Sequence, residues 1–279
     1  MFDDKYQELS FERRPNGVLV IRIGHGHNKN SMNEQLHREL AEVWVDVDRD
    51  AQTRVALITG SGDAFCAGGD FGFIERQIDS FDVAARNMQE AWEIVRNMVD
   101  CQKVVVSAIN GDAVGGGLAV ALMADISLIS TRARLSDGHL RLGVGAGDHA
   151  AVVWPILCGM AKAKYHLLMS SFIDGAEAER IGLVSRVIAD EQLMDEAFEV
   201  CERLATGPQM AARWTKRTLN HWIRQAQPIF DASLAYEILN FFDDDVKEGL
   251  LSLREKRRPA FPSADVHSAG TEREEGAGN

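Results

Sequence analysis

The amino-acid sequence predicts an α/β fold, with a parallel sheet first and a layer of helices after it. Short runs rich in β-branched residues alternate with amphipathic stretches over most of the chain. Two glycine turns each follow a strand-like run and precede a helix-like run, and the last third carries a helical period almost throughout. Alternation of strands with helices is typical of a parallel sheet, because each parallel connection must cross over the sheet.

The first predicted elements are a strand, a helix and a second strand. Residues 18–23 (VLVIRI) are rich in β-branched side chains and predict a strand. Residues 33–48 place their apolar side chains on one face with a 3.6-residue period, which predicts an amphipathic helix. Residues 55–59 are short and apolar and predict the next strand.

The same alternation continues through the middle of the chain. Residues 87–99 predict a helix, residues 104–109 a strand, and the triple glycine at 115–117 opens an apolar helix that runs to residue 122. Residues 125–130 predict another strand, after which residues 135–155 become polar and rich in glycine. We expect functional loops at the glycine turns and in this polar segment.

The remaining residues predict a helical layer with one strand, at 184–188. The chain thus divides into a core at 1–205, a C-terminal helical region at 206–262, and a tail at 263–279 whose small, polar and charged residues predict disorder. The expected helices are 161–169, 175–181, 190–205 and 209–257.

Charge and cysteine content exclude several functional classes. A formal net charge of −12 disfavours nucleic acid and anionic membranes as partners, because the field of the protein repels polyanions. No apolar run approaches the roughly 18 residues of a membrane span, and the first residues resemble no secretory leader. The four cysteines lie far apart without a CxxC pair, which is typical of reduced thiols. We therefore expect a cytoplasmic protein without a metal site.

The two glycine turns are the strongest chemical signal. Glycines at 68–69 and 115–117 each end a predicted strand, and ligands of parallel sheets bind beyond the carboxyl ends of the strands. If the turns are neighbours, one N–H from each can bind the same carbonyl oxygen and stabilise it as it becomes negative, at about 3 to 4 kcal/mol for each donor. The alternative is that these glycines only permit close packing.

Several spaced motifs resemble the crotonase, or enoyl-CoA hydratase/isomerase, superfamily. The resemblance covers residues 18–261, and its motifs follow the family's order along the chain. The motifs are 65–71 (FCAGGDF), 110–117 (NGDAVGGG), 175–178 (GAEA) with 182–184 (GLV), and 248–249 (EG) with 255–257 (EKR).

This resemblance implies a crotonase-like ββα spiral core with a C-terminal helical trimerisation region, assembled as a homotrimer or a dimer of trimers. It also implies an acyl-CoA substrate, with coenzyme A present as part of the thioester and no separate cofactor. The oxyanion donors carry over onto the N–H groups of Gly69 and Gly116. The CoA-binding positions carry over onto Ala67, Gly69 and Lys256, and Lys29 lies near a position where members often hold a basic residue. A cationic cluster of Lys29, Lys256, Arg257 and Arg258 would let an acidic protein bind the CoA phosphates.

The departures from the family pattern concern the acid and base. The two glutamates of the hydratase map onto Ala119 and His139, so paired carboxylate catalysis of water addition is not expected. His139 with Asp148, followed by residues 152–155 (VVWP), locally resembles the β-diketone hydrolase branch typified by 6-oxocamphor hydrolase. We expect His139, with Asp148, to transfer the proton. Isomerisation, thioester hydrolysis and cleavage of a C–C bond all fit this set.

The sequence leaves three alternative functions to consider. One is a true enoyl-CoA hydratase with a non-standard acid and base. Another is an inactive scaffold that binds CoA or RNA, although such a scaffold has no need of both glycine turns. A nicotinamide-dependent oxidoreductase needs GxGxxG after the first strand, whereas residues 24–29 read GHGHNK and lack the third glycine.

Overall fold

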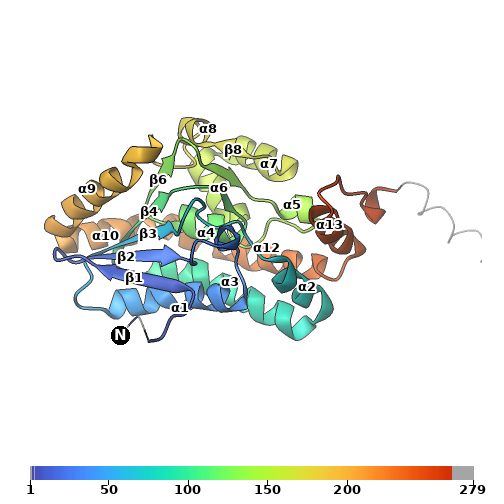
Figure 1. Ribbon diagram of the computed structural model, residues 1–279, viewed down its shortest axis with the longest axis horizontal. Helices are drawn as coiled ribbons and strands as arrows, with labels where there is room; N and C mark the ends of the chain where they lie inside the picture. Colours follow the sequence, from blue (N-terminus) through green and yellow to red (C-terminus); the bar gives the residue numbers. More distant parts are fainter. Residues whose placement is uncertain (1, 3, 266–279) are drawn as a thin grey trace, which may run out of the picture.

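A computed structural model describes residue 2 and residues 4–265. It contains the predicted sheet, with the strand order β1-β2-β3-β4-β6-β9 (Figure 1). All neighbouring strands from β2 onward run parallel. The strands are β1 (Leu9–Arg13), β2 (Val18–Ile23), β3 (Val55–Gly60), β4 (Val104–Ile109), β6 (Ile126–Ser130) and β9 (Arg186–Ile188).

The edge strand β1 is absent from the sequence prediction and runs antiparallel to β2. Its inward-facing positions are few, since Leu9 is buried whereas Ser10 and Glu12 are exposed. The backbone before it is held by Glu39 on the first helix, whose carboxylate accepts hydrogen bonds from the N–H groups of residues 7–9 at 2.6 to 3.0 Å. Because Glu39 lies far along the chain from residues 7–9, this contact gives no local sequence pattern from which the strand could be predicted.

Helices cover both faces of the sheet because its strands are apolar on both sides. Leu19 and Ile21 of β2 pack in the core that contains α1 (Glu34–Arg49) and α3 (Phe81–Asp100). The alternate residues Val18 and Val20 pack with α9 (Leu193–Thr206) on the opposite face. Figure 1 shows α1 and α3 together on one side of the sheet and α9 away from them.

The elements around the carboxyl ends of the strands differ from the prediction in detail. The predicted helix 87–99 is part of the longer α3, and α2 (Phe71–Asp79) precedes it. A second sheet of three very short strands was not predicted, because two-residue and three-residue strands carry no periodicity. These strands are β5 (Ala113–Val114), β7 (Arg134–Ser136) and β8 (Ile173–Asp174), beside α4 (Gly116–Met123) and α5 (His139–Leu142).

The C-terminal third is helical, as predicted, but segment 209–257 is four helices instead of one. The breaks lie at Asn220, Ala226 and residues 241–243. The helices of this third, apart from α9, are α6 (Ala150–Cys158), α7 (Met160–Met169), α8 (Gly175–Arg180), α10 (Gln209–Leu219), α11 (His221–Gln225), α12 (Gln227–Asn240) and α13 (Asp244–Arg254).

The first residues of the predicted tail are part of the folded structure. Ser263 belongs to a short 3-10 helix, Pro262–Ala264, and its N–H donates to Asp245 at 3.0 Å. The rest of the segment predicted as disordered, 266–279, lies outside the described residues. Across the described part of the chain, no helix has the length and apolarity needed to cross a lipid bilayer.

Candidate active site

A cavity of about 430 Å³ opens beyond the carboxyl ends of the central strands. Its lining comes from the two glycine turns, from α2, α3 and α5, and from the C-terminal helices α12 and α13. Of the residues singled out from sequence, Gly69, Gly116, His139, Asp148, Lys29 and Ala67 all line it.

The two glycine turns lie side by side, which was the condition for a shared oxyanion site. Cys66 and Ala113 form a parallel bridge, in which the N–H of Val114 donates to the carbonyl of Cys66 at 2.9 Å. The neighbouring Gly68 has a φ of +85°, and a Cβ there would lie 3.2 Å from the carbonyl oxygen of Val114. Glycine at this position therefore permits both the turn and its contact with the second turn.

The N–H of Gly69 is turned toward the cavity by a bridge to Met32. Met32 donates its N–H to the carbonyl of Gly68 at 2.7 Å and accepts from the N–H of Asp70 at 2.9 Å. In a parallel bridge the residue between these two partners directs its own N–H the other way. Within the described part of the chain the N–H of Gly69 makes no hydrogen bond, so it is available to a ligand.

Gly116 supplies the second N–H as the first residue of α4. The N–H groups of a first helical turn have no acceptor within their own helix. A Cβ at Gly116 would lie 3.3 Å from the sulfur of Met32 and 3.9 Å from Asp148, so this N–H lies close to the acid/base residues. Gly117 has a different reason to be glycine, because a Cβ there would lie 2.5 Å from the Cβ of Cys66.

His139 is oriented by Asp137, a residue to which the sequence prediction gave no role. Its Nδ1 lies 3.1 Å from Asp137 Oδ2, and Asp137 is 2% exposed. Because a carboxylate accepts hydrogen bonds, Nδ1 is the protonated nitrogen of this pair. The other nitrogen, Nε2, then faces Asp148 Oδ2 at 3.8 Å and Glu237 Oε1 at 3.7 Å.

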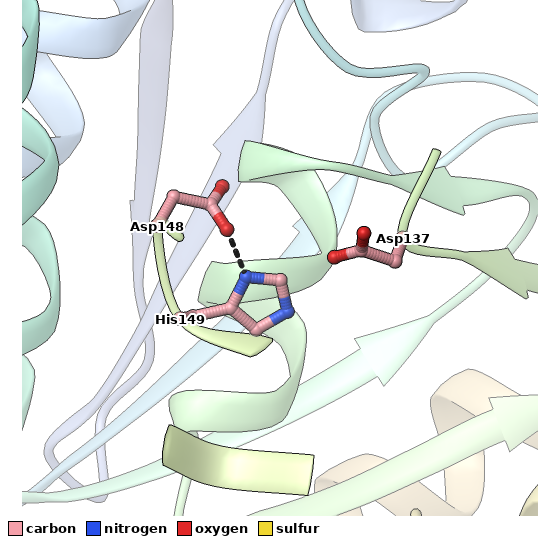
Figure 2. A group of neighbouring side chains, drawn as sticks. All are labelled: Asp137, Asp148 and His149. Carbon is pink, nitrogen blue, oxygen red and sulfur yellow. Dashed lines mark hydrogen bonds and ion pairs between the residues drawn. The ribbon is translucent and has the colours of Figure 1, made fainter. Parts of the chain in front are cut away.

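Asp148 is fixed by His149 on its other side. Nδ1 of His149 lies 2.5 Å from Asp148 Oδ1, and the ring of His149 is completely buried. Figure 2 marks this bond with a dashed line. The indole N–H of Trp154 donates to Nε2 of His149 at 3.4 Å, which leaves Nδ1 as the nitrogen that donates to Asp148. His149 therefore holds Asp148 in place.

Glu237 reaches the cluster from α12, with an exposed fraction of 7%. The loop before α6 lies directly on this helix. Gly147 accepts a hydrogen bond from the hydroxyl of Ser233 at 2.8 Å, and a Cβ at Gly147 would lie 2.7 Å from the Cβ of Glu237. Glycine at 147 therefore allows the close approach that places Asp148 and Glu237 around one histidine.

The burial of these charges shifts their pKa values in opposite directions. Burial raises the pKa of Glu237 to about 8, against the attraction of His139. Burial alone would lower the pKa of His139, but the negative charges of Asp137, Asp148 and Glu237 raise it well above its usual range. Burial also opposes ionisation of Asp148, yet His149 and His139 hold its pKa below the usual range. At neutral pH, Asp148 is therefore ionised, and the raised pKa values of Glu237 and His139 favour a proton on each of them.

The predicted CoA-binding residues are only partly brought together. Lys29 has a φ of +51°, lines the cavity and forms no ion pair within the described residues. Ala67 lies beside it and donates its N–H to the Lys29 carbonyl at 3.1 Å. Lys256 does not line the cavity, and Leu253 is the nearest preceding residue of α13 that does. Arg257 is bonded to Glu248 and Glu255, so the expected cationic cluster is absent from the described cavity lining.

The apolar wall comes mainly from α2. Phe71, Phe73 and Ile74 line the cavity. Trp92 is outside it, with its indole N–H donated to Asp231 at 3.1 Å. Ala119, at the position of the first hydratase glutamate, is buried in α4 and offers no polar atom.

Two overlapping groups of three side chains have the donor atoms that a divalent cation uses, all within 4.8 Å of one another. The groups are Asp137, Asp148 and His149, drawn in Figure 2, and His139, Asp148 and Glu237. In the structure the ring nitrogens and the carboxylates bind one another, through the His139–Asp137 and His149–Asp148 pairs.

Three cavity residues escaped sequence reasoning for different reasons. Asp137 lies in the polar segment 135–155, but its bond to His139 depends on the turn at Gly138, where φ is +78°. Glu237 interrupts the apolar run LAYEIL at 234–239, and a lone acid in such a run was the available signal. His37 lines the cavity from α1, where its Nδ1 lies 2.7 Å from Glu90, and its position in an amphipathic helix gave no signal.

Comparisons with known proteins agree with this geometry. The sequence model of the enoyl-CoA hydratase/isomerase family matches residues 13–264. A crotonyl-CoA hydratase of Syntrophomonas wolfei is 29% identical, over 92% of this chain and 99% of its own. An enoyl-CoA hydratase/isomerase structure from Mycobacterium paratuberculosis superposes with a TM-score of 0.85 at 32% identity, covering 89% and 99% of the two chains.

A third similarity extends over most of the chain and is to a hydrolase. The structure of a β-diketone hydrolase from the cyanobacterium Anabaena sp., bound to (S)-3-oxocyclohexyl acetic acid, superposes with a TM-score of 0.75. The two sequences are 27% identical, and the match covers 86% of this chain and 96% of the other. The predicted α/β fold with a C-terminal helical region is thus confirmed, together with the predicted superfamily.

Proposed function

Because the chain belongs to the enoyl-CoA hydratase/isomerase family, we propose that it acts on an acyl-CoA thioester by hydrolytic cleavage of the C–C bond in a β-ketoacyl group. One observation carries this proposal. Nε2 of His139 lies between the carboxyl groups of Asp148 and Glu237, in the same cavity as two backbone N–H donors. The site thus pairs a base for water with donors for an enolate.

His139 acts as the general base in this reaction. The raised pKa of His139 leaves only a fraction of the histidine neutral at pH 7, and this fraction is the active form. In it, Asp137 holds the proton on Nδ1 at 3.1 Å, so the lone pair lies on Nε2, inside the cavity. Nε2 accepts a proton from water as the water oxygen attacks the β-keto carbon. Asp148 remains ionised and stabilises the imidazolium that forms.

The N–H groups of Gly69 and Gly116 bind the thioester oxygen. When the bond between the α and β carbons breaks, its electron pair moves onto the thioester as an enolate. Two N–H donors aimed at that oxygen stabilise the enolate more than the neutral carbonyl, which is what lowers the barrier. The leaving fragments are a carboxylic acid and a shortened acyl-CoA.

Glu237 supplies the proton that completes the reaction. Its pKa of about 8 keeps a proton on it at neutral pH, and that proton goes to the α carbon of the enolate. The proton taken from water then passes from His139 to Glu237, whose nearest atoms are 3.7 Å apart. One water is consumed, and both residues return to their starting protonation states. These steps need no cofactor and no metal.

Incubation with a β-ketoacyl-CoA tests the proposal directly. Mass spectrometry should find one carboxylic acid and one shortened acyl-CoA, with oxygen from labelled water in the acid. The hydration of crotonyl-CoA should be slow, because Ala119 and His139 replace the glutamate pair. Rapid hydration of crotonyl-CoA without β-ketoacyl cleavage would identify a true hydratase with a non-standard acid and base and would overturn the proposal.

A second candidate is the cleavage of a β-diketone that carries no CoA. Two observations favour it: Lys256 lies outside the cavity lining, and the Anabaena β-diketone hydrolase superposes on this chain. The chemistry at His139 is the same for both substrates. A cyclic 1,3-diketone cleaved in preference to every β-ketoacyl-CoA would select this candidate.

We also propose that the protein is a homotrimer or a dimer of trimers in the cytoplasm. The assembly is supported by large apolar side chains exposed on the C-terminal helices, and the compartment by four free cysteines. Light scattering should find three or six times the 30.8 kDa of one chain. The exposed side chains include Met160, Leu168, Met169, Trp214, Trp222, Ile229 and Tyr236.

A further inference from the structure

The side of the cavity formed by α2 and α3 contains a pair of amides. Gln77 on α2 and Asn87 on α3 both line the cavity, and Gln77 is 3% exposed. Nδ2 of Asn87 donates to Oε1 of Gln77 at 2.5 Å. The other residues of these two helices that line the cavity are apolar, namely Phe71, Phe73, Ile74 and Ala91.

This amide pair leaves one donor and one acceptor unused. Oδ1 of Asn87 is buried and has no hydrogen-bond partner. The NH2 group of Gln77 donates no hydrogen bond within the described part of the chain. Exchanging oxygen and nitrogen in both amides reverses their mutual bond but again leaves one carbonyl and one NH2 free, so the result does not depend on how the amides are oriented.

An unpaired buried amide oxygen costs about 1 to 3 kcal/mol, so it marks a place where a partner is missing. A hydroxyl group can satisfy the pair completely, because it donates one hydrogen bond and accepts another. A ketone or a carboxylate only accepts, and an alkyl chain does neither. Among the groups that an acyl chain can carry, a hydroxyl is the smallest that both donates and accepts, so the chemistry of the pair favours a hydroxyl.

The amide pair lies too far along α2 to bind the reacting carbonyl. The helix begins at Phe71, directly after the turn that carries Gly69, and it rises about 1.5 Å per residue, so Gln77 is about 9 Å along its axis from Phe71. That separation corresponds to several carbon atoms of an extended acyl chain. The hydroxyl would therefore lie well beyond the thioester.

From these observations we infer that Gln77 and Asn87 recognise a hydroxyl group on the distal part of the acyl chain, and that the natural substrates are hydroxylated acyl thioesters. This inference rests on the proposed binding of an acyl-CoA in the cavity. A site whose buried polar groups need a substrate hydroxyl discriminates strongly against the analogue that lacks it.

Calorimetric binding of unreactive ligands tests the inference without requiring turnover. Hexanoyl-CoA and its 4-, 5- and 6-hydroxy derivatives have no β-ketone and are not cleaved by the proposed reaction. At least one hydroxy derivative should bind the wild-type protein 10-fold or more tightly than hexanoyl-CoA. The doubly substituted Gln77→Leu, Asn87→Leu protein should lose this preference and bind hexanoyl-CoA at least as well.

The control variant is Gln89→Leu, which removes an amide from the exposed face of α3, where it bonds to Glu93 at 2.9 Å. It should keep the wild-type preference. Equal affinities of wild type for all four ligands overturn the inference, even if the double variant fails to fold. A preference that survives in a folded double variant also overturns it.

The outcomes also separate this inference from the proposed function. Hydroxyl preference without cleavage of any β-ketoacyl-CoA removes the proposed reaction and leaves the recognition of the hydroxyl in place. Cleavage of a β-ketoacyl-CoA without a preference for the hydroxy derivatives removes the hydroxyl inference and leaves the proposed reaction in place. If none of the four ligands binds, the assignment of the cavity to an acyl-CoA falls, and the hydroxyl inference falls with it.

Discussion

The glycine turns and the acid/base cluster share one cavity but are built in different ways. The turns present backbone N–H groups, which substitution by most other residues leaves in place. The cluster is made of side chains from the turn after β7, from α5, from the following loop and from α12, and each can be replaced singly. Oxyanion binding can thus persist in this fold while the reaction changes. Here Ala119 and His139 stand where the hydratase pattern has its glutamates.

The largest expected effect is on the cluster side of this comparison. His139→Ala removes the proposed base, so kcat for β-ketoacyl-CoA cleavage should fall about 10⁴-fold, the upper end of the range for general bases. The affinity for an unreactive acyl-CoA should change little, because both N–H donors remain. Assays of product formation measure kcat, and calorimetry measures the affinity for the unreactive acyl-CoA. His25→Ala, at an exposed histidine, serves as the control.

Full activity of His139→Ala on every thioester would show that the cluster is structural. It would also revive the reading of the protein as a scaffold that binds CoA.

The turns are tested by removing one N–H without removing the helix. Gly116 is the first residue of α4, a position at which proline is tolerated. Gly116→Pro deletes the donor, and kcat should fall about 10² to 10³-fold. Gly116→Ala adds a Cβ, which meets only the flexible Met32 closely, and keeps the N–H.

Gly116→Ala should therefore retain most of the activity that Gly116→Pro loses. Equal losses in the two variants would mean that crowding, and not the missing donor, accounts for the effect.

How far sequence predicts this site follows from the same contrast. The turns are local, so the glycines at 68–69 and 115–117 indicate where the turns lie, and they predict that the N–H groups there bind an oxyanion. His139 and Asp148 were found through a resemblance in one short segment. Glu237 belongs to a helix packed on that segment through Gly147, and Asp137 acquires its role from the backbone at Gly138. No local pattern encodes such contacts. The edge strand β1 was missed for the same reason, since Glu39 holds the backbone before it.

A third test concerns how Asp137 sets the pH dependence. If His139 is the base, kcat/KM rises as the histidine loses its proton, and the midpoint should lie well above pH 6.5 because the pKa is raised. Asp137→Asn removes one of the charges that raise it. The midpoint should then move about 1 pH unit or more toward acid.

The control is Asp112→Asn, at another acid in the cavity lining, which pairs with Arg134 at 2.7 Å. Its midpoint should stay at the wild-type value. An unchanged midpoint in Asp137→Asn would show that the rise in kcat/KM reports the titration of a group other than His139.

The smallest expected effect is on stability. It distinguishes two glutamates whose pKa values are shifted in opposite directions. The folded-state pKa of Glu237 is raised to about 8 from an ordinary value of 4.5, so the folded protein disfavours its ionised form. Wild type should therefore lose stability as the pH rises from about 4.5 to about 8. Glu237→Gln removes this loss, so its melting temperature relative to wild type should increase between pH 5 and pH 9. The gain in the free energy of unfolding should be about 1 to 3 kcal/mol, and each kcal/mol should raise the melting temperature by roughly 2 to 4 °C.

Glu248 provides the contrast, because its bonds to Arg257 and to the N–H of Ala260 lower its pKa to about 2. A lowered pKa stabilises the fold above the ordinary value and ceases to do so as the pH falls through about 2. Glu248→Gln should therefore lower the melting temperature at neutral pH, and its effect should shrink as the pH approaches 2. Calorimetry across this pH range tests the direction of the change in melting temperature for both variants. A Glu237→Gln protein that is less stable than wild type at pH 9 would show that the ionised carboxylate is well accommodated, and Glu237 could not then be the proton donor at neutral pH.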